Sequence, residues 1–407
     1  MENTLTFSNY WQNYCEKFAG FTIILAAFFL SFSTSLMIMF FLLSIASYWL
    51  AGSYHHKIKY VIHHPLTYWS LGFLALFLLG TTYSSATWGE SFYTLKQYLR
   101  LFLLPMLLPL FLTESNSNRA LNAFLIGAAI MVALSYLKIL GYFSYFHQPN
   151  PNSAFLDHIN TSLIVAISIF ILIYKLTEVK QRANKLFVLS LIGFEVTYLF
   201  LFNTGRSGLV LLFILFSIFL YQKLTKGKFL LGMLIFILSM LGVFTISKNF
   251  SDIIKLAHEH TAAYITHKEL KMPTSEGERL TFWKNSIRLF EKHPMFGTGT
   301  GSFEIEYSKI AGNSLKTDNP HNQYLYFAVQ FGILGVIILI AWFFYLLYIS
   351  RYIPNNLRYI IQGVIISFII GCFFNSWLKD AVPGQLFMFF LAMGFTRLKG
   401  SNSYDYN

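Results

Sequence analysis

The chain has 407 residues, of which 55% are hydrophobic, 19% aromatic and only 12% charged. A soluble domain carries about 25% charged residues, so this composition excludes an ordinary soluble enzyme. Apolar runs of about 18 residues recur along the chain, which is the length that crosses a hydrocarbon core about 30 Å thick. Backbone groups in lipid must pair within their own segment, which predicts helices. We therefore expect an all-α, polytopic transmembrane bundle.

The apolar runs predict twelve spans, which lie near 17–33, 35–52, 66–82, 97–113, 120–140, 158–175, 185–202, 207–222, 229–247, 321–349, 357–375 and 382–396. They divide the chain into nine spans within 1–247, a long loop at 248–320, and three spans with a tail at 321–407. The amino end has no basic n-region and no small-residue cleavage site, so we expect the first span to be retained. Cys15 and Cys372 are too few for a disulfide framework.

Basic residues in the short loops predict the orientation of the spans. They gather in loops of one parity, and the set is Lys57, Lys59, Lys175, Lys180, Arg182, Lys185, Lys223, Lys226, Lys228, Arg351, Arg358, Arg397 and Lys399. Loops rich in Lys and Arg face the cytoplasm, so both termini should lie inside. The loop at 248–320 and the turns near 203–206 and Asp380 should then face outward. The net charge of +12 mostly reflects this topology and does not indicate nucleic-acid binding.

The long loop contains one amphipathic segment, "ERLTFWKNSIRLFEK". Its apolar residues recur at helical spacing, which predicts a helix that covers the bundle or lies at the membrane interface through Leu280, Trp283, Ile287 and Phe290. The following segment, "HPMFGTGTGSF", contains Pro and Gly residues that should break the helix.

The turn "FNTGRSGLV" places Arg206 at the outer amino end of the eighth predicted span. Free backbone N–H groups, the positive helix end and a guanidinium together make an anion site. The guanidinium fork suits phosphate oxygens in particular. The alternative is an arginine that merely reaches the interface, although topology disfavours arginine on the outer face.

Two further basic residues are predicted on the same outer face. Arg279 opens the amphipathic helix, although its spacing alone favours a solvated residue paired with Glu276 or Glu278. His321 follows Asn319, a plausible N-cap, and Pro320, a natural first helical residue, so it should lie in the first turn of the tenth span. The positive helix end favours the neutral imidazole, which suits a general base. An ordinary interfacial histidine is the alternative.

Other polar residues give weaker signals. Lys96 and Arg100 in "YTLKQYLRLF" are four residues apart, so they should share a helix face as a phosphate contact or as interfacial anchors. Four histidines in a predicted cytoplasmic loop should be solvated or interfacial: His55, His56, His63 and His64. Three more lie in the long loop without a cysteine or clustered carboxylate, so we expect no metal site there: His258, His260 and His267. No nucleotide-binding signature is present.

Together these motifs resemble the O-antigen ligase family. "SEGERLTFWKNSIRLFEKHPMFGTGTGSFE" followed by "DNPHNQYLYFAVQFGILG" is similar to the family pattern of an arginine before a Trp-containing helix, a His-Pro-x-x-Gly-x-Gly turn and a His-Asn pair. "NTGRSG" resembles its outer arginine turn, with Gly205 where serine is common. "NSWLKDAVPG" resembles its penultimate outer turn, with Asp380 at the acidic position. The amino-terminal half matches only in being apolar and helical.

The resemblance implies a GT-C-like glycosyltransferase of the bacterial inner membrane whose active site faces the periplasm. Such enzymes transfer a glycan from undecaprenyl pyrophosphate to a sugar hydroxyl of the lipid A core, with inversion and without metal or cofactor. Arg206 and Arg279 would then hold the pyrophosphate, and His321 would be the base. We also expect substrate contacts from Lys96, Arg100, Asn322 and Asp380.

Three alternatives stay open. An O-antigen polymerase would use the same donor with a second polyprenyl-linked acceptor, but polymerases commonly have two sizeable outer loops. A pilin or protein O-oligosaccharyltransferase would use a protein hydroxyl as acceptor. A lipid-linked glycan transporter would carry charged residues deep in its spans, whereas the informative charges here lie at the outer ends.

Overall fold

The computed structural model describes residues 7–142, 152–246, 255, 275–311, 316–354 and 356–398. Within these ranges the chain is helical, without β-strands. In chain order the elements are α1 (Phe7–Phe29), α2 (Thr34–Leu50), α3 (Tyr54–His63), α4 (Pro65–Thr82), α5 (Trp88–Gln97), α6 (Leu99–Leu107), the 3-10 helix η1 (Leu108–Phe111), α7 (Glu114–Ile139), α8 (His158–Glu178), α9 (Arg182–Leu201), α10 (Arg206–Lys223), α11 (Lys226–Ile246), α13 (Ser275–Lys292), α14 (Phe303–Ala311), α15 (Gln323–Ser350), α16 (Leu357–Phe374) and α17 (Ala381–Phe395).

Each predicted span overlaps one of these helices. Seven of the described helices are long and apolar enough to cross a membrane: α4, α7, α8, α9, α10, α15 and α16. Helices α2 and α17 are apolar but shorter. A polytopic helical bundle is therefore confirmed, and a total of twelve crossings stays a prediction.

The segment predicted as a regular span at 97–113 is instead interrupted. Helix α6 has 9 residues, which is about 14 Å of helix and too short for the hydrocarbon core. Pro105 lies inside α6, and Pro109 opens a 3-10 turn, because proline cannot donate the backbone hydrogen bond that continues an α-helix. A further break at Tyr98 separates α6 from α5, so Lys96 and Arg100 belong to different helices and do not share the predicted face.

Two polar side chains are more deeply buried than the sequence indicated. His64, predicted to be solvated or interfacial, is buried as the N-cap of α4. Its Nδ1 accepts from the N–H of Leu66 at 3.2 Å, and Nε2 lies 3.1 Å from the carbonyl of Phe395. Glu195 is fully buried inside the predicted span of α9, where Ser168 Oγ donates to its Oε1 at 3.0 Å. Glu195 is thus an ionisable residue deep in a span, where the sequence analysis placed the informative charges only at the outer ends.

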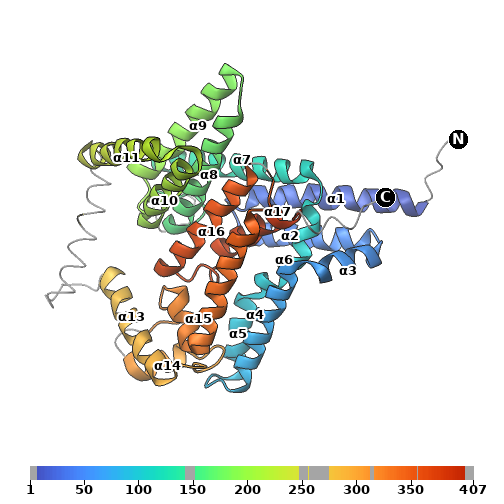
Figure 1. The fold of residues 1–407 in the computed structure, drawn as a ribbon, viewed down its shortest axis with the longest axis vertical. Coiled ribbons are helices and arrows are strands. Elements are labelled where there is room, and N and C mark those ends of the chain that lie inside the picture. Colours follow the sequence, from blue (N-terminus) through green and yellow to red (C-terminus); the bar gives the residue numbers. More distant parts are fainter. Residues whose placement is uncertain are drawn as a thin grey trace.

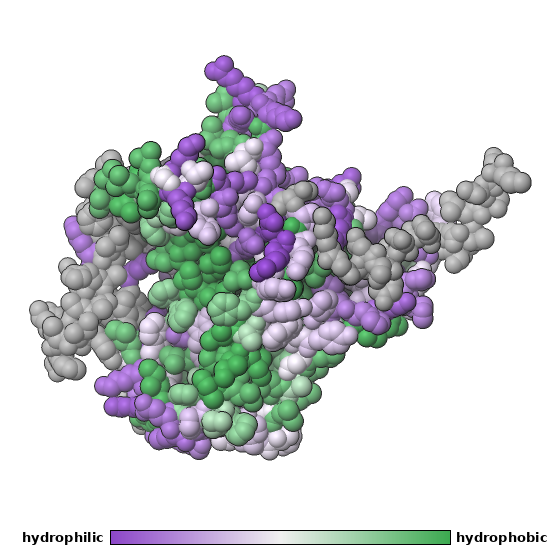
Figure 2. Space-filling model, viewed as in Figure 1, coloured by the Kyte–Doolittle hydropathy of each residue, from purple (hydrophilic) through white to green (hydrophobic). Residues whose placement is uncertain are grey.

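Helices α13 and α14 lie together beside one end of α15, at the opposite end of the view from α9 (Figure 1). The face in Figure 2 has a hydrophobic area over α15 and α16, with hydrophilic residues near α9 and over α13 and α14. An apolar band between two polar ends is the pattern expected of a protein that crosses a membrane.

Candidate active site

Helix α15 begins at Gln323, about one turn after Pro320, which the sequence predicted as the first helical residue. Its N-cap is Asn322, whose side chain accepts from the N–H groups of Tyr324 and Leu325, both at 3.0 Å. The expectation that Asn319 is the cap was wrong, because Asn319 Oδ1 instead accepts from the backbone N–H of His321 at 2.9 Å. His321 lies before the helix with φ at 52°. This left-handed conformation is unusual for a residue other than glycine, and it is often found at functional sites.

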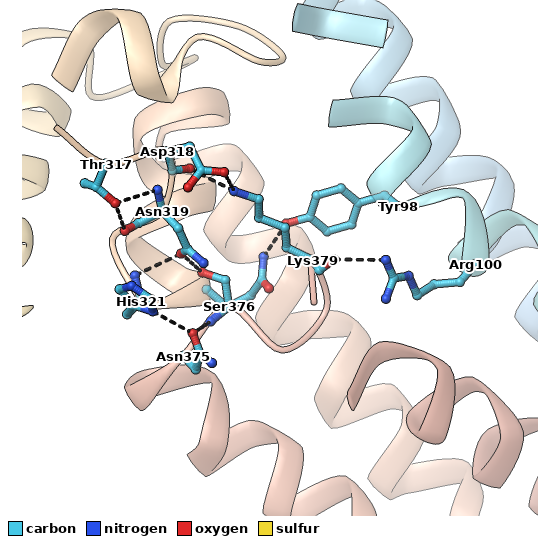
Figure 3. A network of polar contacts seen from close by, with 10 residues as sticks. Tyr98, Arg100, Thr317, Asp318, Asn319, His321, Asn375, Ser376 and Lys379 are labelled. Carbon is cyan, nitrogen blue, oxygen red and sulfur yellow. Dashed lines mark hydrogen bonds and ion pairs between the residues drawn. The ribbon is translucent and has the colours of Figure 1, made fainter. Parts of the chain in front are cut away.

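A polar network joins the loop before α15 to the turn between α16 and α17 (Figure 3). Lys379, only 6% exposed, donates to both the carbonyl and the carboxylate of Asp318 at 2.8 Å. Ser376 Oγ donates to Asn319 Oδ1 at 2.7 Å. Two residues after Asn319, His321 Nδ1 lies 3.0 Å from Oδ1 of Asn375, the residue before Ser376. Successive contacts of this kind fix the backbone on which His321 stands.

The imidazole of His321 is half-buried between two elements. One face lies against the ring of Phe282 from α13, with centroids 6.1 Å apart and planes at 28°. Burial lowers the pKa of His321 below its usual value, and the charges of Arg279 and Lys379 act in the same direction. The hydrogen bond with Asn375 and the charge of Asp318 oppose that shift. At neutral pH the ring is therefore neutral, as a base requires.

The inward side of α13 differs from the predicted stripe. Its buried residues are Phe282, Asn285, Ser286 and Leu289. Ile287, predicted to be inside, is 46% exposed. Hydropathy missed this because two of the buried residues are polar and find partners: Asn285 donates to Tyr307 Oη at 3.2 Å, and Ser286 donates to a backbone carbonyl within the helix.

Helix α13 also brings Arg279 toward His321. Trp283 Nε1 donates to the carbonyl of Pro320 at 3.0 Å, and Phe282 contacts the His321 ring. Residues three and four apart share a helix face, so Arg279 lies one turn away on the face that touches this loop. Burial lowers the pKa of Arg279, although a guanidinium stays charged. A partly desolvated cation attracts an anion more strongly than one in bulk water.

The glycine-rich turn after α13 holds this helix against α15. Helix α15 has a break at Gly332, where φ is 63° and ψ is −158°. The turn supplies donors to carbonyls beside this break: Thr298 N bonds Val329 O at 2.9 Å, and Gly299 N bonds Gln330 O at 2.8 Å. The His-Pro-x-x-Gly-x-Gly motif thus binds the backbone of α15 and fixes the position of α13, the helix that carries Arg279.

Arg206 begins α10, as predicted. The two glycines beside it allow α10 to approach α8: a Cβ on Gly205 would lie 2.4 Å from the carbonyl of His158, and one on Gly208 would lie 2.3 Å from Ser162 Cβ. The close approach of the His158 carbonyl explains why residue 205 is glycine, where the family that the sequence resembles commonly has serine. The guanidinium groups of Arg206 and Arg279 are close enough to repel each other electrostatically. Arg279 is therefore within electrostatic reach of both Arg206 and His321.

The other predicted substrate contacts are arranged differently. Lys96 is exposed at the end of α5. Arg100 donates to the carbonyls of Gln97 at 2.6 Å, Lys379 at 2.9 Å and Asp380, so its fork holds the turn before α17. Asn322 uses its side-chain oxygen to cap α15. These three residues keep their substrate roles only as predictions.

Asp380 occupies the N-cap position of α17, but its side chain makes no capping hydrogen bond. Burial raises its pKa to about 6, against the opposing charges of Lys379 and Arg100. Asp157 at the start of α8 lies close enough to raise the pKa of Asp380 slightly. The amino ends of α8 and α17 therefore lie near each other.

The sequence analysis missed three residues of this region: Phe282, Asn375 and Lys379. Two of them stand in the quoted "NSWLKDAVPG" turn, so a motif signal was present without an assigned role. Phe282 could not be found because the expected stripe was displaced around the helix. The described residues contain no group of three metal-ligating side chains, and His258, His260 and His267 lie outside the described ranges.

Comparison with known protein families places these features in context. The model of the family described as O-antigen ligase matches residues 188–340. The resemblance to the O-antigen ligase family is confirmed. The matched segment contains Arg206, Arg279 and His321, and it falls in the superfamily that includes O-antigen ligases and polymerases. The search of curated proteins gave no match. The described apolar helices indicate a multi-pass membrane protein, and residues 188–340 are similar to a family of glycosyltransferase-like enzymes.

Proposed function

We propose that this protein is an O-antigen ligase. It would transfer a polysaccharide from undecaprenyl pyrophosphate to a sugar hydroxyl of the lipid A core, at the periplasmic face of the inner membrane. The observation that carries the proposal is that the Arg279 guanidinium lies within electrostatic reach of both Arg206 and a neutral His321. These residues come from α10, α13 and the loop before α15, which are far apart in the sequence.

The chemistry of the donor requires groups of these types. The glycosidic C1–O bond to phosphate breaks, and the electron pair leaves with the pyrophosphate, so negative charge grows on the leaving group. Fixed cations aimed at that charge stabilise the transition state. Arg206 and Arg279 would supply them, and their mutual repulsion is relieved when an anion binds between them. No metal ion is assigned to this step.

The acceptor hydroxyl attacks C1 from the opposite side and forms the new glycosidic bond. Its proton passes to His321, which the burial of its ring keeps neutral. Attack opposite the leaving group inverts the configuration at C1. The hydrophobic helices around the site would hold the polyprenyl tail within the membrane.

Reconstitution with two acceptors tests the proposal. Purified enzyme in lipid nanodiscs is incubated with undecaprenyl-pyrophosphate glycan and lipid A core, without added metal. A ligase joins the polymer to the lipid A core. Polymer that grows only on a second polyprenyl-linked glycan would instead identify a polymerase, and transfer to neither acceptor would overturn the proposed reaction. Transfer only to a pilin hydroxyl would identify a protein O-oligosaccharyltransferase.

A further inference from the structure

The side chain of Asn375 makes a contact that decides how His321 can act, and this inference rests on the proposed function. Asn375 is the C-cap residue of α16, and its Oδ1 lies 3.0 Å from His321 Nδ1. The backbone N–H of Ser376 also donates to this oxygen at 2.9 Å. A backbone N–H can only donate, so the Asn375 atom that faces the ring is the amide oxygen and not the amide nitrogen.

An amide oxygen can only accept, so His321 Nδ1 must be the donor. A neutral imidazole carries one proton, and placing it on Nδ1 leaves the lone pair on Nε2. In the described part of the chain, Nε2 has no hydrogen-bond partner within reach. Nε2 is thus both the nitrogen that can accept a proton and the nitrogen that makes no hydrogen bond to the described residues.

We propose that Asn375 is the positioning residue of this site: it fixes the Nδ1–H tautomer of His321 and makes Nε2 the atom that receives the proton of the acceptor hydroxyl. The neighbouring contacts hold the same arrangement. Ser376 Oγ and the N–H of His321 share Asn319 Oδ1, which ties the histidine backbone to the same turn. Phe282 limits rotation of the ring from its other side.

The charged groups around His321 bear on how the site responds to pH. Arg279 faces it from α13, Lys379 from the turn after α16, and Asp318 from its own loop. Asn375 is neutral, so it directs the proton without adding a charge. A carboxylate in its place would keep the acceptor atom and would also stabilise the imidazolium.

Three variants separate these effects. Asn375→Leu removes the acceptor with little change in size, and it should lower kcat about tenfold with KM for the donor unchanged, since an ordinary hydrogen bond is worth about that factor. Asn375→Asp should retain kcat at alkaline pH, while its acid limb moves upward by roughly one pH unit. The matched control is Tyr324→Phe, which removes another hydrogen bond between α15 and α16, to the carbonyl of Ile369 at 2.8 Å. It should leave both kcat and the acid limb unchanged.

A direct measurement is the ¹⁵N spectrum of histidine-labelled wild-type enzyme in nanodiscs, with the His321 signal assigned by its loss in His321→Gln. We expect a protonated Nδ1 and a bare Nε2 above the acid limb. A protonated Nε2 in wild type would overturn the inference, even if Asn375→Leu fails to fold. An Asn375→Asp profile identical to wild type would also overturn it. Retained turnover in His321→Gln would overturn the proposed function of His321 as the base. The tautomer would then have no role in proton transfer, whichever nitrogen the spectrum shows to be protonated.

Discussion

The packing of the glycine-rich turn can be disrupted by Gly299→Ala, which substitutes no residue of the candidate active site. Gly299 has φ at +93°, and a Cβ there would lie 2.3 Å from Ser84 Cα and 2.6 Å from the carbonyl of Gly80. Both are backbone atoms, so they cannot rotate aside as the end of a side chain could. The turn must therefore shift away from the end of α4 and the residues that follow it.

The cost follows from the contacts that are lost. A left-handed conformation costs an alanine roughly 1–2 kcal/mol. Two hydrogen bonds join the turn to this segment, from Thr300 N–H to the carbonyl of Gly80 and from Ser85 N–H to the carbonyl of Thr298, and each contributes about 0.5–1.5 kcal/mol. The sum is about 2–5 kcal/mol. Arg279 also loses its fixed position relative to His321, so turnover should fall further than the loss of folded protein explains.

Two measurements in nanodiscs test this prediction. Thermal unfolding gives the loss of stability, and the rate of glycan transfer is divided by the amount of folded protein. The control is Gly72→Ala in α4, where an added Cβ meets nothing within 4 Å. It should be neutral or slightly stabilising, because alanine favours helix more than glycine does. If Gly299→Ala matches Gly72→Ala in both stability and turnover, the turn does not hold the site together.

The remaining predictions concern the phosphate site and the topology. Arg206→Ala and Arg279→Ala should each lower turnover roughly 100- to 1000-fold, and the lysine variants less, because lysine keeps the charge but loses the fork. Wild-type turnover by either alanine variant at normal membrane level would assign that arginine to anchoring. A cysteine at exposed Lys284 should react with a membrane-impermeant thiol reagent in spheroplasts, and one at exposed Lys226 should not; the reverse pattern would invert the predicted orientation. The native cysteines are buried and should give little background.

Features that depend on composition and periodicity were predictable from the sequence. In lipid, the backbone N–H and C=O groups of a long apolar segment must be hydrogen-bonded within the segment, which requires a helix. Each predicted span accordingly overlaps a helix. The three basic residues could be selected as candidates, because Arg206, Arg279 and His321 stand beside local breaks in the apolar pattern. Their meeting depends on tertiary contacts and could only be suggested by the family resemblance.

Features that depend on partners distant in the chain were not predictable. Asn319 has the residue type of an N-cap, but its oxygen bonds Ser376, 57 residues away, and the helix begins later. The buried side of α13 contains Asn285 because Tyr307 accepts its N–H. Arg100 resembles a free phosphate contact until the carbonyls of the turn before α17 are placed against it.

The central claim is that His321 accepts the proton of the attacking hydroxyl, and turnover as a function of pH tests it most directly. Purified wild-type and His321→Gln enzymes are compared with donor and lipid A core, without metal. Because the pKa of His321 is lowered, wild-type activity should be full near neutral pH and fall as the pH drops through that lowered pKa, where the imidazolium cannot accept a proton. Asp380 has a pKa of about 6 and would titrate nearby, so the profile is repeated in Asp380→Asn, where the limb from His321 should persist.

His321→Gln should lose about 100- to 10,000-fold in turnover, and its residual activity should lack the acid limb. Turnover near the wild-type rate in His321→Gln, or an acid limb that survives the substitution unchanged, would contradict the account.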